Sequence, residues 1–420
     1  MRKFVSLLLM FLVFTTACQN EETTPQAEPE TPIEPTIDNN RKDIAITKSE
    51  EQMAAQNTDF AFNLFRTMEQ AYPEKGENAL SPISASFALS MLANGTQGET
   101  LDELLKGLGW EEFTSAQMNA FNKKLLSELP TLDRTSSVAL ANSIWFNNGF
   151  KALEGFTKNL TENYNAEVRQ TDFNTAVPVI NRWCSDHTNG CIKEFLESLD
   201  PTSQAVLLNA TYFKGNWKIP FLKENTRKET FYNEDGTSCE ADFMWSANYF
   251  HYGKNEQFAA IELPYGNEAF SLQVILPNKG QEWKQCIEAL TGETWNTFQK
   301  GMKRESVSVQ LPKFTIEQKD NLKEALNLLG IKRVFTREAD FGKMTGQQLY
   351  LGVIKQATFF RIDEKGTEAA AITGTATDVE NNGGEAIKPI DFHAQRPFLF
   401  ILTEKSTGTI LFIGKVTNMN

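Results

Sequence analysis

The sequence has few of the residues from which metal sites and hydrolytic active sites are built. Its 420 residues include three histidines and five cysteines. It contains no Gly-x-Ser-x-Gly, His-Glu-x-x-His, P-loop or Cys-x-x-Cys motif. A Ser, His and Asp triad drawn from distant positions stays open, but no motif indicates one. We therefore expect a protein that is not an enzyme, uses no cofactor and binds no metal.

Positive charge is also scarce. The chain has 41 Lys and Arg against 54 Asp and Glu, which gives a formal net charge of −13. Nucleic acids and other polyanions are bound mainly through clustered Lys and Arg, so neither is an expected partner. Hydrophobic residues make up 40% of the chain, which is enough for a large core and excludes wholesale disorder.

The hydrophobic run at the N-terminus is too short to cross a bilayer. Residues 4–14 form eleven positions, apolar except for Ser6, after the basic start Met1-Arg2-Lys3. Thr15-Thr16-Ala17-Cys18 follows and is similar to a bacterial lipobox. We expect residues 1–17 to be a lipoprotein signal peptide and Cys18 to carry the lipid; an ordinary secretory signal is the alternative. The protein would then be exported across the inner membrane and anchored in the outer membrane or at the cell surface.

Composition divides the remaining chain into a tether and one domain. Residues 18–47 are rich in Glu, Thr, Pro and Asn and are predicted to be flexible. Residues 48–420 show neither repeats nor low-complexity segments, and we expect them to form one large, monomeric domain. Four cysteines remain in it, and a bridge between Cys184 and Cys191 is as compatible with the sequence as buried thiols.

Helical and strand patterns are both present but unevenly distributed. Ser81-Pro82 predicts the start of a helix, and Thr100 with Glu103 has the spacing of a capping box. The helical patterns crowd the first half of the chain and most strand patterns the second, which indicates an α+β fold rather than alternating βαβ units. The expected strands are residues 138–146, 205–213, 270–276, 307–311, 357–362, 398–402 and 408–416.

A segment of 23 residues, 366–388, lies between two strongly apolar strand patterns and is too long for an ordinary connection. If its first half formed a strand, one face would carry only small, uncharged side chains. These are Thr367, Ala369, Ala371, Thr373, Thr375 and Thr377. Such a segment can be exposed and still enter a sheet, because no bulky or charged side chain would be forced into the core.

Several dispersed motifs resemble those of the serpins, in the family's order. They occupy residues 81–84, 209–217, 311–314, 364–371, 392–400 and 408–416. The resemblance covers roughly residues 43–420. It implies the serpin fold: three β-sheets, about eight or nine helices and an exposed reactive-centre loop at about residues 364–390.

The resemblance also assigns roles to individual residues. The hinge, where the loop leaves the central sheet, would be Gly366, Thr367, Glu368, Ala369, Ala370 and Ala371. The breach, where the central strands part, would contain Trp217. The shutter, at the middle of that sheet, would contain Asn209, Ser81, Ser84 and Gln356. Many serpins have His where this chain has Gln356, and Asn78 lies three rather than four residues before Ser81, so the hydrogen bonds that hold the sheet closed must differ.

The function implied is suicide inhibition of a serine, or alternatively a cysteine, endopeptidase through a covalent complex. Counting from the hinge places the scissile bond at Glu380–Asn381. Val379 is an alternative, and counting back from Pro397 gives Ala386 instead. The acidic balance argues against a heparin site. A non-inhibitory serpin that acts as a binding module, and a lipoprotein hydrolase, are the competing hypotheses.

Overall fold

The computed structural model describes residues 39–73, 75–367 and 388–419. Within them the chain forms nine α-helices, in agreement with the expected eight or nine. The helices are α1 Lys48–Ala71, α2 Pro82–Gly95, α3 Gly98–Leu108, α4 Ser115–Glu128, α5 Glu154–Tyr164, α6 Val177–His187, α7 Trp283–Glu288, α8 Gly292–Gly301 and α9 Lys323–Leu328. Short 3-10 helices are η1 Leu129–Thr131, η2 Lys223–Asn225 and η3 Arg333–Phe335. None of the helices in these ranges is long and apolar enough to span a membrane.

Helix starts follow local sequence rules in some places and tertiary contacts in others. Ser81 is the N-cap of α2 with Pro82 in its first turn, as expected. The predicted capping box at Thr100 is wrong, because α3 already begins at Gly98. Thr100 is buried there and accepts a hydrogen bond from the Asp340 N–H at 3.0 Å. Glu103 accepts hydrogen bonds from the N–H groups at the start of η3.

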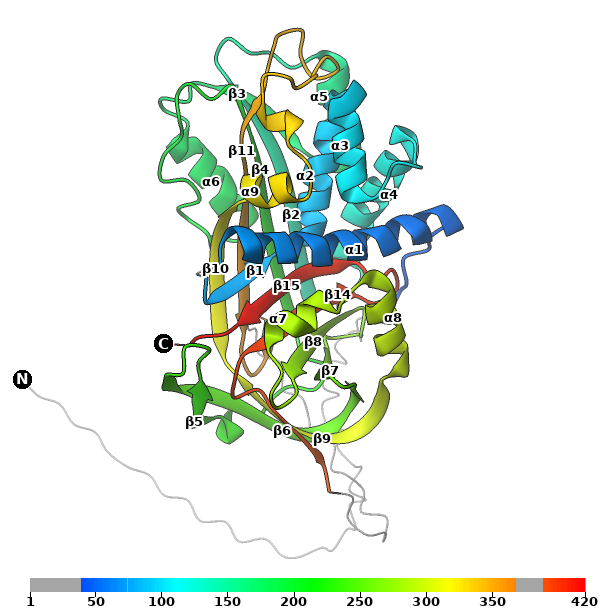
Figure 1. Cartoon of the computed structure of the whole chain (residues 1–420), viewed down its shortest axis with the longest axis vertical. Coiled ribbons are helices and arrows are strands. Elements are labelled where there is room, and N and C mark those ends of the chain that lie inside the picture. The colour runs from blue at the N-terminus through cyan, green and yellow to red at the C-terminus, as the bar shows by residue number, and fades with distance from the viewer. Residues whose placement is uncertain (1–38, 74, 368–387, 420) are drawn as a thin grey trace, which may run out of the picture. The chain divides into compact units, whose positions relative to one another are not determined.

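A six-stranded sheet, called here the central sheet, has the order β10-β11-β4-β2-β3, with β12 paired to β4. Its strands are β2 Ser136–Asn147, β3 Glu167–Thr171, β4 Ala205–Asn216, β10 Phe314–Asn321, β11 Leu351–Ile362 and β12 Gly366–Thr367. Figure 1 shows α2 alongside β2 and β4, and α3, α4 and α5 also pack on α2.

The remaining strands form a nine-stranded sheet in the order β1-β15-β14-β8-β7-β6-β9-β13, with β5 paired to β6. They are β1 Glu77–Leu80, β5 Arg227–Tyr232, β6 Ser238–Lys254, β7 Phe258–Pro264, β8 Phe270–Pro277, β9 Lys303–Pro312, β13 Ile390–His393, β14 Phe398–Glu404 and β15 Ile410–Val416. Instead of three separate sheets, the described residues form two hydrogen-bonded networks. The reason is β6, which spans 17 residues and pairs with β5, β9 and β7 in turn, so that it joins two groups of strands.

Aromatic side chains fill the space between the two sheets. Phe360 of β11 stacks on Phe400 of β14, with ring centroids 4.8 Å apart and an interplanar angle of 8°. Phe314 of β10 contacts both rings, and Phe412 of β15 contacts Phe360. Rings of this size contribute a large buried apolar area, so this layer fixes the central sheet against the larger one.

The folded unit begins at Asn39, nine residues before the boundary that composition indicated. Ile44 is only 3% exposed, and its N–H donates to Ser406 Oγ at 2.9 Å. The Asn39 side chain donates to Asp133 at 3.0 Å. Composition missed these contacts because one buried isoleucine and a few hydrogen bonds are enough to fix a polar segment. The signal peptide, Cys18 and residues 19–38 lie outside the described residues.

Candidate functional site

The candidate site is the seam between β4 and β11, the two parallel neighbours at the middle of the central sheet. Their register runs from Leu351 opposite Ala205 to Phe359 opposite Tyr212. After β11 the chain turns back at residues 363–366 and forms β12, which is antiparallel to β4. The first two hinge residues therefore already pair with β4, beyond the point where its pairing with β11 ends.

Gly366 is required by this turn. Asp363 N–H donates to the Gly366 carbonyl at 2.8 Å, and Gly366 N–H donates back to the Asp363 carbonyl at 3.2 Å. Gly366 has φ +145°, and a Cβ atom there would lie 2.0 Å from the Gly215 carbonyl oxygen. Only glycine allows both this backbone conformation and this close approach to β4.

Thr367 is fully buried, at 0% exposure. Its hydroxyl lies 2.7 Å from the Tyr265 hydroxyl. Burial raises the pKa of Tyr265 well above its ordinary value, so this phenol stays neutral and can act as donor or acceptor. The structure thus places the first residue of the small-residue face inside the molecule. Glu368, Ala369, Ala370 and Ala371 lie outside the described residues.

Trp217, assigned to the breach, donates two hydrogen bonds to the backbone of the hinge turn. Its indole N–H donates to the Asp363 carbonyl at 2.9 Å, and its backbone N–H donates to the Lys365 carbonyl at 2.8 Å. Its ring stacks on Tyr265 with centroids 4.3 Å apart. Trp217 thus binds the backbone of the turn, and Tyr265, stacked on Trp217, binds the side chain of Thr367.

Glu364 ties the outer side of the same turn to the larger sheet. Its carboxylate accepts hydrogen bonds from Thr226 Oγ1 at 2.8 Å and from Lys313 Nζ at 3.1 Å. Burial alone would raise the pKa of Glu364. Its own backbone N–H, Thr226 and Lys313 outweigh that effect, so the pKa lies below its ordinary value of 4.5.

The lowered pKa predicts an acid-sensitive hinge. Since the folded state favours ionised Glu364, its stabilising contribution is complete above 4.5 and is lost as the pH falls through the lower folded pKa. We expect Glu364→Gln to lower the melting temperature at neutral pH and to have a progressively smaller effect as the pH falls below 4.5. Thermal unfolding of both proteins across this range checks it; a difference that does not change with pH would contradict it.

Gln356, assigned to the shutter, binds the start of α2. Its Nε2 donates to the Ser81 carbonyl at 2.8 Å, and its Oε1 accepts from the Ser81 N–H at 2.8 Å. Two residues along β11, Thr358 Oγ1 donates to the Ala79 carbonyl at 2.7 Å. β11 is therefore held to the segment that joins β1 to α2.

A row of buried polar side chains crosses the central sheet at the level of Gln356. Asn142 on β2, Asn209 on β4, Gln356 on β11 and Asp320 on β10 are consecutive cross-strand partners, none more than 2% exposed. Asn209 donates to Asn142 at 2.6 Å, and Asp320 forms an ion pair with Lys75. The side chains of Asn209 and Gln356 therefore hydrogen-bond to other residues and not to each other. Separating β4 from β11 at this level would break no side-chain hydrogen bond between the two strands.

The two serines assigned to the shutter behave differently from Gln356. Ser81 contributes its backbone, whereas the hydroxyls of Ser81 and Ser84 are buried and form no hydrogen bond with the part of the chain that the structure describes. The displaced Asn78 donates to Glu69 at 2.8 Å. The altered spacing therefore directs Asn78 toward α1 rather than toward the shutter.

Four residues of the site were not identified from the sequence: Tyr265, Lys313, Asn142 and Asp320. Each reaches the seam or the hinge from a strand or loop far away in sequence, so no local pattern marks it. Only Lys313 lay inside a recognised motif, residues 311–314, where it was interpreted as part of a core strand.

The thiols and acidic groups suggest no competing chemistry in the described ranges. Cys184 is a buried thiol and forms no bridge to Cys191; burial raises its pKa to about 12. Burial raises the pKa of Cys286 to about 11. No group of His, Cys, Asp and Glu side chains within residues 39–73, 75–367 and 388–419 is arranged to hold a metal ion.

Comparisons with known proteins agree with this geometry. Residues 55–419 match the family model described as Serpin (serine protease inhibitor). Neuroserpin of Gallus gallus is 32% identical over 374 residues, which cover 85% of this chain and 90% of the relative. The native crystal structure of the thermophilic serpin tengpin superposes with a TM-score of 0.81 at 29% identity, covering 90% of this chain and 96% of that one. Human thyroxine-binding globulin complexed with its hormone gives a TM-score of 0.81 at 26% identity, covering 88% and 99%. The chain belongs to the serpin family.

Proposed function

We propose that this serpin inhibits a serine endopeptidase as a suicide substrate, by inserting its cleaved loop between β4 and β11. The observation that carries this proposal is the register of β12, with Gly366 opposite Asn216 and Thr367 opposite Gly215. Because the pairing is antiparallel, each further loop residue would meet the preceding residue of β4 on insertion. The first residue of β4, Ala205, is 216 − 205 = 11 positions from Asn216, so its partner would be residue 366 + 11 = 377.

The composition of the loop supports insertion over this whole length. The side chains that would share the buried face with Thr367 are alanines and threonines up to Thr377. The segment would replace the pairing of β4 with β11 by two new strand pairings, a form of strand addition to an existing sheet. Glu380 lies three residues beyond Thr377, so cleavage there would release enough chain to cover β4 completely.

The chemistry requires no catalytic group from the serpin. The protease hydroxyl would attack the Glu380 carbonyl carbon, the bond to the Asn381 nitrogen would break, and the Asn381 amine would leave with a proton. The ester that remains links Glu380 to the protease. Hydrolysis by water would release an active enzyme, whereas insertion before hydrolysis would pull the acylated enzyme out of its working geometry. The proposal also includes the lipid anchor at Cys18, which would hold the inhibitor at the outer membrane or cell surface.

A panel of serine and cysteine endopeptidases tests the proposal. We expect a glutamate-preferring enzyme to give a complex that survives denaturing electrophoresis, together with a released peptide that begins at Asn381. Release beginning at Glu380 or at Ile387 would instead assign the scissile residue to Val379 or Ala386. Mass spectrometry of the released peptide identifies the cleaved bond directly. Loop cleavage without any covalent complex would contradict inhibition and support the non-inhibitory alternative.

A further inference from the structure

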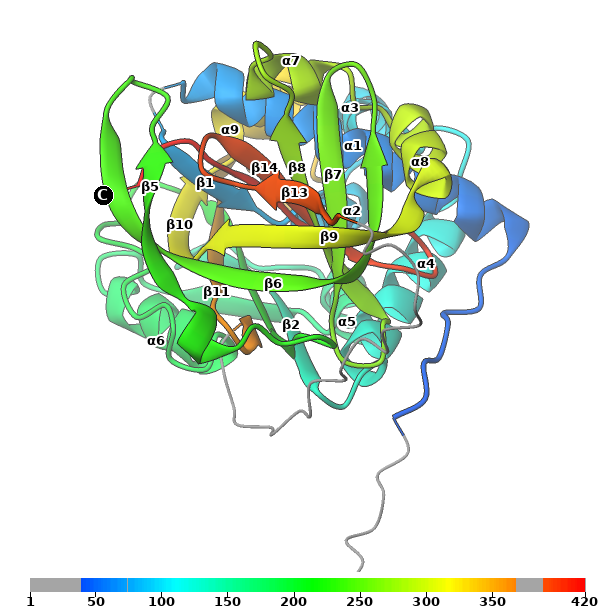
Figure 2. The ribbon, with the colours of Figure 1, turned by 90° about the horizontal axis from the view of Figure 1, so that it is seen from below.

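The segment ahead of α1, residues 39–44, is called here the strap. Figure 2 shows it in blue as an extended chain, and it contains neither helix nor strand. It precedes residue 55, where the match to the serpin model begins, so it lies outside the part of the chain that the family model describes. Both of its ends are nevertheless fixed to the folded domain, at Asn39 and at Ile44.

The first end of the strap binds Asp133, a carboxylate that is only 2% exposed. Asn39 donates to Asp133 Oδ1 at 3.0 Å and accepts from the Arg134 N–H at 3.0 Å. Asp133 also accepts hydrogen bonds from Thr135 and, at 2.9 Å, from Ser136 Oγ. Asn39 therefore contributes one of the hydrogen bonds that stabilise a buried charge, and such a group is destabilised when it loses a donor.

Through Asp133 the strap is joined to the start of β2. Ser136 is the first residue of β2 and lies opposite Gly215 of β4, which is also the register partner of Thr367 in the hinge. β2 pairs with β4 as far as Phe146 opposite Ala205. Because of this long pairing, β4 cannot move away from β11 without carrying β2 with it, so a contact that fixes the start of β2 resists the opening of the seam.

The turn at residues 265–269 is a second connection from Asp133 to the hinge. Gly266 packs directly against Asp133, since a Cβ atom on Gly266 would lie 2.1 Å from Asp133 Oδ2. The Gly266 N–H donates to the Asn216 carbonyl at 2.9 Å. The preceding residue, Tyr265, contacts the Thr367 hydroxyl. With no free space between Gly266 and Asp133, the position of Asp133 also fixes the turn that carries the hinge partner Tyr265.

The second end of the strap is anchored independently of Asp133. Ile44 is 3% exposed, and its N–H donates to Ser406 Oγ at 2.9 Å. The next carbonyl, that of Ala45, accepts from Lys124 Nζ at 2.9 Å. Because this end is already fixed, the contact between Asn39 and Asp133 costs little additional conformational entropy.

We propose that the strap holds the breach closed in the uncleaved protein and so delays insertion of the loop until the loop is cut. Asn39 would act through Asp133 as a positioning residue, at the start of β2 and at the turn that carries Tyr265. This inference rests on the proposed function, because a delay matters only for a loop that inserts. It adds that pulling on the chain ahead of the strap, or cutting the strap itself, would release the loop earlier.

The test compares Asn39→Asp with the parent protein, both as the full, uncleaved chain. The variant loses the donor to Asp133 and sets two carboxylates against each other, so the strap should leave Asp133. We expect backbone hydrogen exchange in residues 213–217 and 363–367 to accelerate about tenfold, while exchange in β7 and β8 stays the same. The uncleaved variant should lose its trapping activity about tenfold faster during incubation. Asn39→Ala, which adds no charge, should change both rates in the same direction by about threefold.

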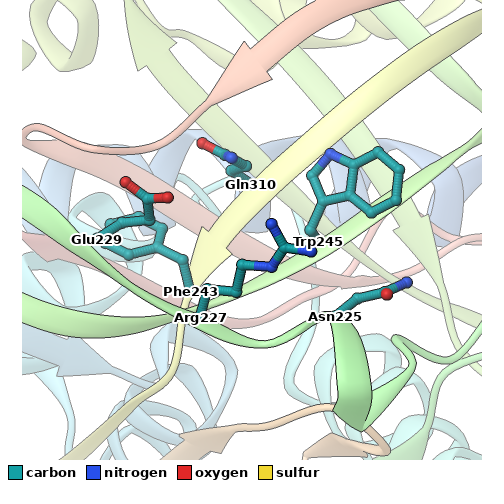
Figure 3. Close-up of a pocket in the computed structure, with 6 residues that line it drawn as sticks. All are labelled: Asn225, Arg227, Glu229, Phe243, Trp245 and Gln310. Atoms are coloured by element: carbon teal, nitrogen blue, oxygen red, sulfur yellow. The ribbon is translucent and has the colours of Figure 1, made fainter.

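Two controls separate the strap from the added charge and from the loss of any terminal contact. Gln310→Glu also turns an amide into a carboxylate, on a side chain of β9 that lines the pocket of about 190 Å³ shown in Figure 3. Asn233→Asp makes the same substitution at the other end of the chain, where Asn233 accepts from the Met419 N–H at 2.9 Å. We expect both controls to exchange at the breach as the parent does.

The outcomes distinguish the strap from the proposed function. Unchanged exchange in residues 213–217 and 363–367 of Asn39→Asp would overturn the strap. Acceleration by the same factor in β7 and β8, or an equal acceleration at the breach in either control, would overturn it as well. Faster exchange confined to the breach, combined with a parent protein that traps no enzyme of the panel, would contradict inhibition and support the strap.

Discussion

Thr367→Arg is expected to convert this protein from an inhibitor into a substrate. The panel enzyme that the parent protein traps should cleave the variant and then be released active. The covalent complex should nearly disappear from denaturing gels, while the peptide released from the loop still appears. The readout is the number of inhibitor molecules consumed for each enzyme molecule inactivated, which should rise steeply.

The size of this effect follows from the position of Thr367. Its side chain is fully buried beside Tyr265, at the point where β12 starts to pair with β4. An arginine there would force the hinge out of the sheet in the uncleaved protein, and insertion would then have to bury an unpaired charge, which costs several kcal/mol. If about 3 kcal/mol of this cost is added to the insertion barrier, insertion slows roughly 100-fold, and hydrolysis of the acyl-enzyme overtakes it.

Thr367→Val is the matched variant, because it keeps the shape and removes only the hydroxyl. It loses the contact with Tyr265 but places no charge in the sheet, so we expect it to remain an inhibitor. Unchanged trapping by Thr367→Arg would show that inhibition does not pass through insertion at this position. An equal loss in both variants would assign the effect to the hydroxyl rather than to charge on the inserting face.

Much of the fold could be predicted from the sequence wherever the local pattern and the tertiary environment agree. The strands predicted at residues 205–213, 270–276 and 398–402 appear as β4, β8 and β14, because every residue of these segments is buried and most of them are apolar. β6 was not predicted, because its burial changes from residue to residue and gives no clear period of two. The expectation of three separate sheets came from the resemblance to the serpins, and the strand patterns did not include the strand that joins two of the groups.

The site was predictable as a set of motifs but not as a set of contacts. Gly366, Thr367 and Trp217 came from recognised segments and Gln356 from its place ten residues before Gly366, and the structure brings them to one seam. The partners that hold them, such as Tyr265 for Thr367 and the Ser81 backbone for Gln356, are fixed only by strand register. A backbone N–H or carbonyl is present in every residue, so the sequence does not show which one a side chain will bind. The sequence therefore showed glutamine where many serpins have histidine, but not that this glutamine binds the Ser81 backbone.

Gln356→Leu is expected to accelerate spontaneous insertion of the uncleaved loop. The amide of Gln356 satisfies both the N–H and the carbonyl of Ser81, and all of these groups are buried. Leucine has a similar size but no polar atoms, so the buried Ser81 N–H would lose its partner at a cost of about 1–3 kcal/mol. The Ser81 carbonyl would lose one of its two hydrogen bonds and keep the one from the Ala85 N–H at 3.1 Å. The variant should therefore melt at a lower temperature and lose inhibitory activity during incubation at least about tenfold faster than the parent.

A control variant separates the loss of general stability from the faster insertion of the loop, because its lost hydrogen bonds lie elsewhere in the sheet. Gln318→Leu on β10 removes two hydrogen bonds, one to the Glu77 carbonyl at 3.0 Å and one from Lys75 Nζ at 3.4 Å. Both lie on the strand at the outer edge of the central sheet rather than at the seam. We expect that control to melt slightly earlier but to keep its activity for as long as the parent. If Gln356→Leu behaved in the same way, Gln356 would stabilise the fold in general. A loss of activity that clearly exceeds the loss of stability would instead show that the bonds between Gln356 and Ser81, which anchor β11 to the start of α2, resist the separation of β11 from β4 until the loop is cut.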